Sequence, residues 1–389
     1  MAALAAVLLS WAPPATADVQ SEVAKLAGNG VVLAVDKDGE TVVSVHADKE
    51  FTPASTLKVV TTLLAAETLG LDARFETDFW VADGKLVVRG KGDPYLVSEE
   101  LDLLAKDLAP KLEGQTLTGV VIDDSWFESG ITIPGVTATT EPYDALNSAT
   151  AVNFNTINVV VNDGVVTSAE DQTPLTALAK EVAKREGVRG KNRINIGKNP
   201  KDSRRYAGEL IALKLAAAGV SIEPNVTDGT APDEAPLHTH QNSRTLGEVC
   251  GAMLYYSNNY IANQVFLAVG AKAKGAPASL AKSVEVANAF IAEHPALSGI
   301  AMVEGSGISY KNQATGQAFI GALTLFEPHR ALLRVRHESP HKTGTLKITK
   351  SVVGYVETKE HGDVRYVISL DGGGSQRRWD IVKTLQRLL

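Results

Sequence analysis

The sequence predicts an α+β protein in which an antiparallel sheet, flanked by helices, is interrupted by a large inserted domain. Three observations lead to this prediction: a hairpin pattern near the N-terminus, further strand patterns near the C-terminus, and a long stretch between them in which short strand and helix patterns are mixed. Strands that are distant in the chain can pair in one antiparallel sheet. Residues 18–74 and 245–389 are therefore expected to form one domain, with residues 75–244 as the insertion.

The first elements follow from local patterns. Residues 30–51 alternate apolar and polar side chains around a Lys-Asp-Gly turn, which is typical of a β-hairpin. A helix is expected from about Ser55 to Gly70. Within the insertion the patterns predict a strand and then a turn at 86–96, and strands at 117–127 and 155–164. They also predict helices at 98–112, 174–187 and 204–219, a loop from the second of these strands to about 147, and a surface linker at 231–243.

The last part of the chain returns to helices and strands. Helices are expected within 245–271 and 279–294, and a closing helix over 377–389. Two strands are expected at 344–358 and 364–370, where they can pair with the N-terminal hairpin. These strands complete the predicted antiparallel sheet.

Composition narrows the function classes. The 389 residues suggest two or more domains, and the net charge of −7 with no long basic run argues against a nucleic-acid partner. The single cysteine, Cys250, excludes an intrachain disulfide, and its helical context favours a core residue over a nucleophile. No stretch after the N-terminus reaches the roughly 18 unbroken apolar residues of a membrane span.

The N-terminus resembles a secretory signal peptide. Residues 2–9 are apolar, and Ala15, Thr16 and Ala17 form a small-x-small cleavage pattern before Asp18. The alternative is an apolar N-terminal helix. We interpret residues 1–17 as a cleaved signal, which predicts a periplasmic or otherwise extracytoplasmic protein.

Ser55 and Lys58 form the first candidate for chemistry. At i and i+3 on a helix they share one face. A serine hydroxyl needs a base to become a nucleophile, and a lysine becomes a base when burial or neighbouring cations lower its pKa. The pattern S-x-x-K alone is weak, because it occurs three times, at Ser55, Ser279 and Ser339.

Two further motifs strengthen the pair. Ser257-Asn258-Asn259 is an S-x-N triplet beside a helix, and Lys342-Thr343-Gly344 opens a predicted strand. The ordered set S-x-x-K, S-x-N and K-T-G occurs in penicillin-binding proteins and serine β-lactamases. By themselves, S-N-N could be a helix N-cap and K-T-G a turn into a strand.

With these motifs the sequence resembles the class C low-molecular-mass penicillin-binding proteins, which are D-alanyl-D-alanine carboxypeptidases/endopeptidases of bacterial cell walls. The resemblance extends from about residue 25 to the C-terminus, through segments such as PASTLKVVTTLLAAETLG, SNNYIANQVF and VEGSGISYKNQAT. The long interval between Lys58 and Ser257 is similar to this family and differs from β-lactamases. The resemblance implies a transpeptidase-like domain with an insertion, and no cofactor.

The resemblance also implies roles for the motif residues. Ser55 would form the acyl-enzyme, Lys58 would activate it, Ser257 would relay a proton, and Asn259 would bind the substrate amide. Lys342 would bring positive charge beside the site.

Substrate binding is expected at the third motif. Thr343 would hold the terminal carboxylate, the Gly344–Thr345 edge would pair with the substrate backbone, and the N–H groups of Ser55 and Thr345 would form the oxyanion hole. We expect Gly344 to be needed because a side chain there would obstruct close approach to the strand.

Other positions carry weaker expectations. Asp144 and Glu141 are candidates for recognising a cationic or zwitterionic group of the substrate. The loop 305–309 is expected to give structural support. Four histidines, His238, His240, His337 and His341, invite a metal site, but their spacing lacks the pattern of a zinc site, so no metal is expected. The segment before Lys342 is short compared with the family, which predicts a changed cleft there.

Three functions are consistent with these motifs. The first is a penicillin-sensitive D,D-peptidase with peptidoglycan stem peptides as substrates and β-lactams as inhibitors. The second is a catalytically weak wall-binding or β-lactam-sensing module. The third is a β-lactamase or esterase on the same scaffold, although no additional motif supplies an efficient deacylating water. The ordered motifs and the long insertion favour the first.

Overall fold

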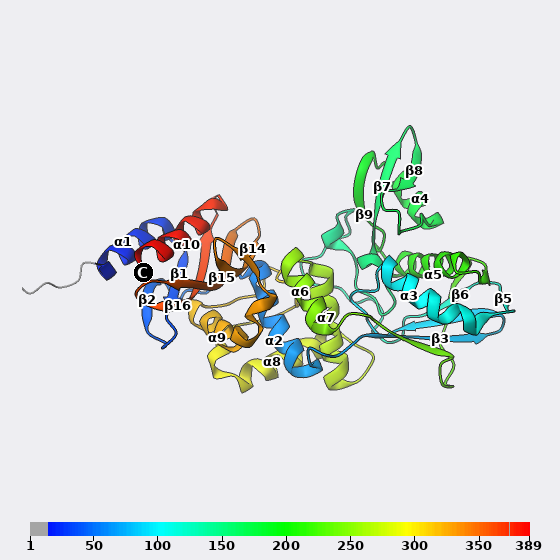
Figure 1. Cartoon of the computed structure of the whole chain (residues 1–389), viewed down its shortest axis with the longest axis horizontal. Helices are drawn as coiled ribbons and strands as arrows, with labels where there is room; N and C mark the ends of the chain where they lie inside the picture. The colour runs from blue at the N-terminus through cyan, green and yellow to red at the C-terminus, as the bar shows by residue number, and fades with distance from the viewer. Residues whose placement is uncertain (1–14, 373) are drawn as a thin grey trace, which may run out of the picture.

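The computed structural model describes residues 15–372 and 374–389. The molecule is elongated, with the first and last of the described residues in one part and residues 76–241 in the other (Figure 1). Helices α2 (Lys58–Leu69), α6 (Leu246–Tyr256) and α7 (Asn259–Lys274) lie between the terminal sheet and the inserted segment (Figure 1). The α+β prediction is confirmed.

A six-stranded sheet joins the two ends of the chain in the order β13-β14-β15-β16-β1-β2, with all neighbours antiparallel. The N-terminal hairpin pairs with the C-terminal strands, with Val31 opposite Ser369 and Val35 opposite Arg365. The predicted pairing is therefore observed. The strands are β1 (Val31–Val35), β2 (Thr41–Val45), β13 (Arg334–Arg336), β14 (Ser339–Thr345), β15 (Thr349–Thr358) and β16 (Gly362–Asp371).

Both faces of this sheet are buried, which explains the continuous apolar run of β1. Successive side chains of a strand point to opposite faces. Leu33 packs into the core formed with α2, α6, α7, α8 and α9, whereas its neighbour Val32 packs into the core under α1 and α10. The helices are α1 (Ala15–Ala27), α2 (Lys58–Leu69), α6 (Leu246–Tyr256), α7 (Asn259–Lys274), α8 (Leu280–Glu293), α9 (Gly316–Phe326) and α10 (Gln376–Leu388).

The segment between these elements builds its own sheets and its own apolar core. A five-stranded sheet has the order β11-β6-β4-β3-β12, and smaller sheets have the orders β8-β7-β9 and β10-β5. The strands are β3 (Glu76–Ala82), β4 (Lys85–Gly90), β5 (Thr116–Leu117), β6 (Val120–Asp123), β7 (Thr156–Asn162), β8 (Val165–Ser168), β9 (Gly190–Asn195), β10 (Ser221–Ile222), β11 (Val226–Asp228) and β12 (His238–Gln241); the helices are α3 (Ser98–Leu108), α4 (Ala177–Arg185) and α5 (Pro200–Ala217).

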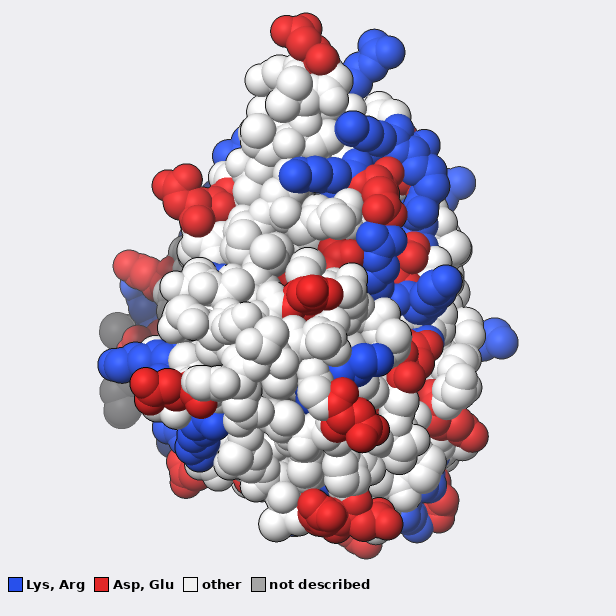
Figure 2. Space-filling view, turned by 90° about the vertical axis from the view of Figure 1, so that its right-hand side faces the viewer, with Lys and Arg blue, Asp and Glu red and all other residues white. Residues whose placement is uncertain are grey.

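The end of the molecule formed by this segment carries charges of both signs. Lys and Arg side chains gather along one side of the face in Figure 2, Asp and Glu lie among them, and a broad uncharged area lies beside them. This face therefore presents no field of a single sign.

Two local predictions are wrong. Residues 231–243 are not simply a surface linker, because β12 pairs with β3 at the edge of the five-stranded sheet and His240 is buried. The expected strand at 344–358 is two strands, since β14 ends at Thr345 and β15 begins at Thr349. Lys342-Thr343-Gly344 therefore lies near the end of a strand instead of opening one.

The predicted signal peptide falls almost entirely outside the described residues. Helix α1 begins at Ala15, within the expected cleavage pattern. Within residues 15–372 and 374–389, no helix has both the length and the apolar character needed to cross a bilayer.

Candidate active site

Ser55 lies in the first turn of the helical segment after the N-terminal hairpin. This turn is the 3-10 helix η1 (Ala54–Leu57), which leads directly into α2. Gly307 packs onto the turn so closely that a Cβ atom there would lie 1.9 Å from the carbonyl oxygen of Ala54. The loop that contains Gly307 thus supports the turn, while Ser55 stays partly exposed.

Lys58 is fully buried, and its Nζ atom contacts three oxygen atoms. Ser55 Oγ lies at 2.9 Å, Asn259 Oδ1 at 2.8 Å and the carbonyl oxygen of Ser306 at 2.7 Å. One amine therefore connects η1, the first residue of α7 and the loop after α8. The first two motifs of the sequence meet at this atom.

The surroundings of Lys58 favour its neutral form. Burial lowers its pKa well below the ordinary value, the charge of Lys342 lowers it further, and Glu304 acts in the opposite direction. A neutral amine has two N–H groups and one lone pair. Asn259 Oδ1 and the Ser306 carbonyl can only accept, so they take the two N–H groups. In the charged form Lys58 Nζ donates to Ser55 Oγ as well. In the neutral form the lone pair is left for Ser55, whose hydroxyl can then donate to it.

The S-N-N triplet forms the junction between α6 and α7. Ser257 ends α6 in the left-handed conformation, with φ 56° and ψ 37°, and Asn258 caps α7 by accepting from the N–H of Ile261 at 3.0 Å. Asn259, the first residue of α7, turns towards Lys58. The capping interpretation therefore holds for Asn258, while Asn259 of the same triplet contacts the Lys58 amine.

Lys342 connects the K-T-G motif to the S-N-N motif by a hydrogen bond. Its Nζ donates to Ser257 Oγ at 2.8 Å and to the carbonyl oxygen of Thr343 at 2.9 Å. Burial, with a contribution from the charge of Arg378, lowers the pKa of Lys342 to about 7. The structure thus brings together Ser55, Lys58, Ser257, Asn259 and Lys342.

The outer edge of β14 is open beside this cluster. Strand β13 pairs with β14 only from Ser339 to His341, and β15 pairs on the other side. Residues 342–345 therefore have no strand partner on the outer edge among the described residues. Thr343 is partly exposed and Thr345 is exposed, so this short stretch can accept another strand.

Gly344 is required for a different reason from the one expected. A Cβ atom there would lie 2.3 Å from Ser351 Oγ, 2.6 Å from the carbonyl oxygen of Pro53 and 3.0 Å from Ala54 Cβ. The glycine thus lets β14 pack against the serine turn and β15, within the protein itself. This packing places β14 directly against Pro53 and Ala54, the two residues that precede Ser55.

Two charged residues support the site but lack a sequence signal. Glu304, which is fully buried, accepts from the N–H groups of Ser306 and Gly307, both at 2.7 Å, and from Asn312 Nδ2 at 2.6 Å. It thus holds the loop whose carbonyl contacts Lys58. Arg378 of α10 donates to the carbonyl oxygens of Gly344 at 2.9 Å and Ser351 at 3.0 Å.

Asp144 has a different environment from the one expected. It is buried, and its Oδ1 accepts from the N–H of Thr137 at 3.0 Å while its Oδ2 accepts from the hydroxyls of Thr137 and Thr139. With both oxygens engaged, the carboxylate fastens its own loop and has little capacity to contact a substrate. Glu141, which begins that turn, is exposed.

The remaining candidates lie elsewhere. Ser279 caps α8, and Ser339 is buried inside the sheet with its hydroxyl beside Tyr366. Cys250 is fully buried in the core, where burial raises its pKa to about 12. His240 contacts Glu100 at 2.9 Å, and in the described part of the chain no group of three or more His, Cys, Asp or Glu side chains is arranged to hold a metal.

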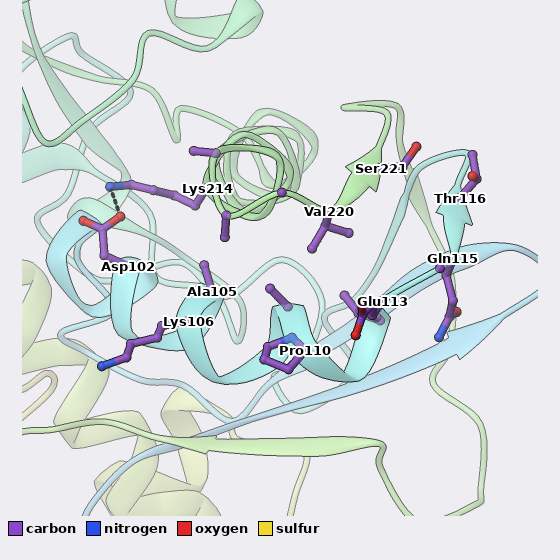
Figure 3. Close-up of a pocket in the computed structure, with 16 residues that line it drawn as sticks. Asp102, Ala105, Lys106, Pro110, Glu113, Gln115, Thr116, Lys214, Val220 and Ser221 are labelled. Carbon is purple, nitrogen blue, oxygen red and sulfur yellow. Dashed lines mark hydrogen bonds and ion pairs between the residues drawn. The ribbon is translucent and has the colours of Figure 1, made fainter.

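Another hollow lies far from this site, at the outer end of the inserted segment. It measures about 830 Å³ and is lined by α3, the turn after it and the end of α5 (Figure 3). Its Lys214 is already paired with Asp102 at 2.6 Å (Figure 3). A smaller hollow of about 530 Å³ adjoins the site itself and is lined in part by Ser257 and Asn259.

The chain matches a known protein family over most of its length. The sequence profile of the D-Ala-D-Ala carboxypeptidase 3 (S13) family matches residues 16–336. The chain is 25% identical to a D-alanyl-D-alanine carboxypeptidase of Actinomadura sp. (strain R39) over 345 residues, covering 76% of this chain but 64% of that relative. The chain thus spans somewhat less than two thirds of the relative's length.

Solved structures show a shared fold. Penicillin binding protein 4 from Haemophilus influenzae, also solved with a β-lactam, has a TM-score of 0.73 at 18% identity, covering 95% of this chain and 98% of that one. A predatory peptidoglycan endopeptidase from Bdellovibrio bacteriovorus, also solved in a penicillin G-acylated form, has a TM-score of 0.54 at 19% identity, covering 92% of each chain. The resemblance stated from the motifs is confirmed: the chain belongs to the D-Ala-D-Ala carboxypeptidase 3 (S13) family.

Proposed function

We propose that this protein is a penicillin-sensitive serine D,D-carboxypeptidase/endopeptidase, which cleaves D-Ala-D-Ala termini or D-Ala cross-links of peptidoglycan through an acyl-enzyme on Ser55. The observation that carries the proposal is the buried amine of Lys58, 2.9 Å from the Ser55 hydroxyl. Membership of the family supports it, as do the names of the carboxypeptidase and endopeptidase relatives.

Acylation begins with transfer of the Ser55 proton to Lys58. Ser55 Oγ then bonds to the carbonyl carbon of the penultimate D-Ala, and the negative charge on the carbonyl oxygen is stabilised by the N–H groups of Ser55 and Thr345. Backbone donors suit this task because they are fixed before the reaction starts. The close packing of Gly344 on Pro53 and Ala54 supports this pairing of donors.

Departure of D-alanine requires a proton on its nitrogen. The Ser257 hydroxyl is the proposed relay, because it accepts from Lys342 at 2.8 Å and so can pass its own proton onward. With a pKa near 7, Lys342 can replace that proton at neutral pH. Before deacylation Lys58 releases to solvent the proton that it took from Ser55, and Lys342 regains a proton from solvent. The neutral Lys58 amine can then take a proton from the water that attacks the ester carbonyl, and it returns that proton to Ser55 Oγ as the ester bond breaks.

The open edge of β14 is the proposed substrate-binding strand. A peptide added there would form main-chain hydrogen bonds to residues 342–345. Its terminal carboxylate would lie beside Thr343 and the positive charges of Lys342 and Arg378, and Asn259 would hold the amide on the acyl side. β-Lactams would occupy the same position as inhibitors.

Intact mass spectrometry after incubation with benzylpenicillin tests this proposal. We expect a single lasting adduct on the wild type and none on Ser55→Ala. Ser279→Ala is the matched control, since it alters another S-x-x-K serine, and it should form the adduct. Absence of an adduct on every protein, together with no release of D-alanine from a D-Ala-D-Ala peptide, would favour a binding module. Rapid turnover of nitrocefin would favour a β-lactamase.

The family also supports a location and a domain role. A peptidoglycan hydrolase works outside the cytoplasm, so we propose an extracytoplasmic protein whose first 17 residues direct its export. We further propose that residues 75–244 form an accessory domain inserted into the peptidase domain of residues 18–74 and 245–389. Its separate apolar core supports this division.

A further inference from the structure

The short segment before Lys342 ends in β13, which closes one end of the open edge of β14. Residues 342–345 have no strand partner on this edge among the described residues, whereas β13 pairs with the three residues before them. The oxyanion hole is proposed at Thr345 and the terminal carboxylate at Thr343. A leaving group longer than D-alanine therefore extends from Thr343 past Lys342, towards β13.

Arg334 is the residue of β13 nearest to this end of the open edge. It is in register with His341, the residue before Lys342, and neighbouring strands lie about 5 Å apart. Its guanidinium lies 5.0 Å from the centre of the ring of Tyr255, which is near the end of α6 and two residues before Ser257. Arg334 thus connects β13 to α6 at the end of the cleft where Lys342 donates to Ser257.

The charge of Arg334 has no partner of opposite sign in the described part of the chain. Arg330, in the same short segment, is paired with Asp363, whereas no carboxylate forms an ion pair with Arg334. The Arg334 and Tyr255 side chains are both exposed. The five N–H groups of the guanidinium are therefore available to a ligand, while the aromatic ring limits where the group can lie.

Neighbouring groups add to the positive charge at this end of the cleft. Burial lowers the pKa of His341 to about 4, and the charge of Lys342 acts in the same direction. Arg334 and Arg336 contribute as well, so both guanidinium groups lie close enough to affect β14. Glu338, in the turn of the same hairpin, forms no ion pair with either arginine among the described residues. An anionic group that arrives here therefore meets uncompensated positive charge.

Resting on the proposed function, we propose that Arg334 determines specificity on the leaving side of the scissile bond by binding a second carboxylate of the leaving group. The first carboxylate would lie at Thr343, as it would for D-alanine. A free guanidinium matches a second one, because it binds a carboxylate through two parallel hydrogen bonds. The substrate class is thus a D-alanyl peptide whose leaving residue carries an additional acidic group. Arg334 therefore favours endopeptidase cleavage where the leaving strand is acidic.

Two pairs of peptides test this role of Arg334. All four share the acyl part acetyl-L-Lys-D-Ala and differ in the leaving residue. The first pair has D-Glu or D-Gln, and the second has D-2-aminopimelate or its side-chain amide, which reaches two methylene groups farther. We expect the wild type to prefer the acid by about tenfold or more in kcat/KM for at least one pair, as a hydrogen bond between charged groups implies. Arg334→Gln should reduce that preference to about twofold or less.

Arg336→Gln is the matched control. Arg336 is an exposed cation on the same strand, but its guanidinium lies 4.5 Å from the centre of the Trp379 ring, on α10 instead of α6. This variant should keep the wild-type preference, and a benzylpenicillin adduct verifies that the serine site is assembled in each protein. Equal kcat/KM values within both pairs in the wild type, or an unchanged preference in Arg334→Gln, would overturn the role of Arg334. A preference lost equally in Arg336→Gln would also overturn it, because overall charge would then explain the effect.

Failure of the proposed function gives a different result, namely neither cleavage of any D-alanyl peptide nor a penicillin adduct on the wild type. Isothermal titration calorimetry with the same four peptides then tests Arg334 directly. Tighter binding of an acid than of its amide, lost in Arg334→Gln and kept in Arg336→Gln, would support the proposal. Equal or undetectable binding within both pairs would overturn it.

Discussion

Replacing Gly344 with alanine should slow acylation, because the new methyl group would separate β14 from the serine turn. The Cβ atom would lie 2.3 Å from Ser351 Oγ and 2.6 Å from the carbonyl oxygen of Pro53. Ordinary contacts between such atoms are about 3.5 Å, so each must lengthen by about 1 Å. The Pro53 carbonyl is backbone and directly precedes the turn that carries Ser55, so rotation of a side chain cannot relieve that contact.

The size of the effect follows from this displacement. A misplacement of about 1 Å in a catalytic arrangement lowers the rate by about 100-fold, or about 2.7 kcal/mol in the barrier. Overpacking should also lower the free energy of unfolding by about 1–3 kcal/mol. The rate should therefore fall by more than a loss of stability alone can explain, since the protein remains folded at room temperature.

Timed intact mass spectrometry with benzylpenicillin measures the acylation rate constant, and urea unfolding measures stability. Gly251→Ala is the matched control: it lies in α6, and the nearest atom to its Cβ position is 3.7 Å away. It should acylate at the wild-type rate. If Gly344→Ala acylates within about threefold of the wild type, then contact between β14 and the turn does not set the geometry of the site.

Two further predictions concern charges. With its pKa lowered to about 7, Lys342 binds a proton in the unfolded state but not in the folded state between pH 7 and its ordinary value. The free energy of unfolding should thus rise with pH in that window by up to about 1.4 kcal/mol per unit, relative to Lys342→Met. Urea unfolding from pH 7 to 9 measures this; the same pH dependence of the free energy of unfolding in both proteins would contradict it. Glu304→Gln removes the charge that raises the pKa of Lys58, so the acid limb of benzylpenicillin acylation should move to lower pH, and the mismatched amide should reduce stability by about 1–3 kcal/mol. An acid limb of Glu304→Gln at unchanged or higher pH would contradict this. Glu327→Gln, which alters an exposed glutamate, is the control and should keep the wild-type acid limb.

Local patterns were sufficient to predict the fold and the cluster of motifs. The run Val31–Val35 and the strand pattern at 364–370 predicted the terminal sheet, because both are short and apolar. The spacing of Ser55 and Lys58 predicted a shared helical face, which the turn from η1 into α2 provides. These features depend on a few neighbouring residues, which is why the sequence alone reveals them.

Features that depend on distant packing were not predictable. In the closing helix nothing distinguishes Arg377 from Arg378, and packing of α10 on the sheet decides that Arg378 is the buried one. Glu304 adjoins a glycine-rich loop that reads as a turn. Strand β12 has the polar sequence HTHQ, and only its pairing with β3 makes it a strand.

Lys58 shows why such a site is built from distant parts of the chain. Burying an ammonium is unfavourable, and the neutral amine that burial favours must still satisfy two N–H groups. The two acceptors come from Asn259 and from the Ser306 carbonyl, each more than 200 positions away in sequence. Removing either would leave a polar group unpaired in the core and free the amine to turn away from Ser55. The contacts that make burial of Lys58 tolerable therefore also direct its lone pair at the nucleophile, so stability and basicity of the site depend on the same three hydrogen bonds.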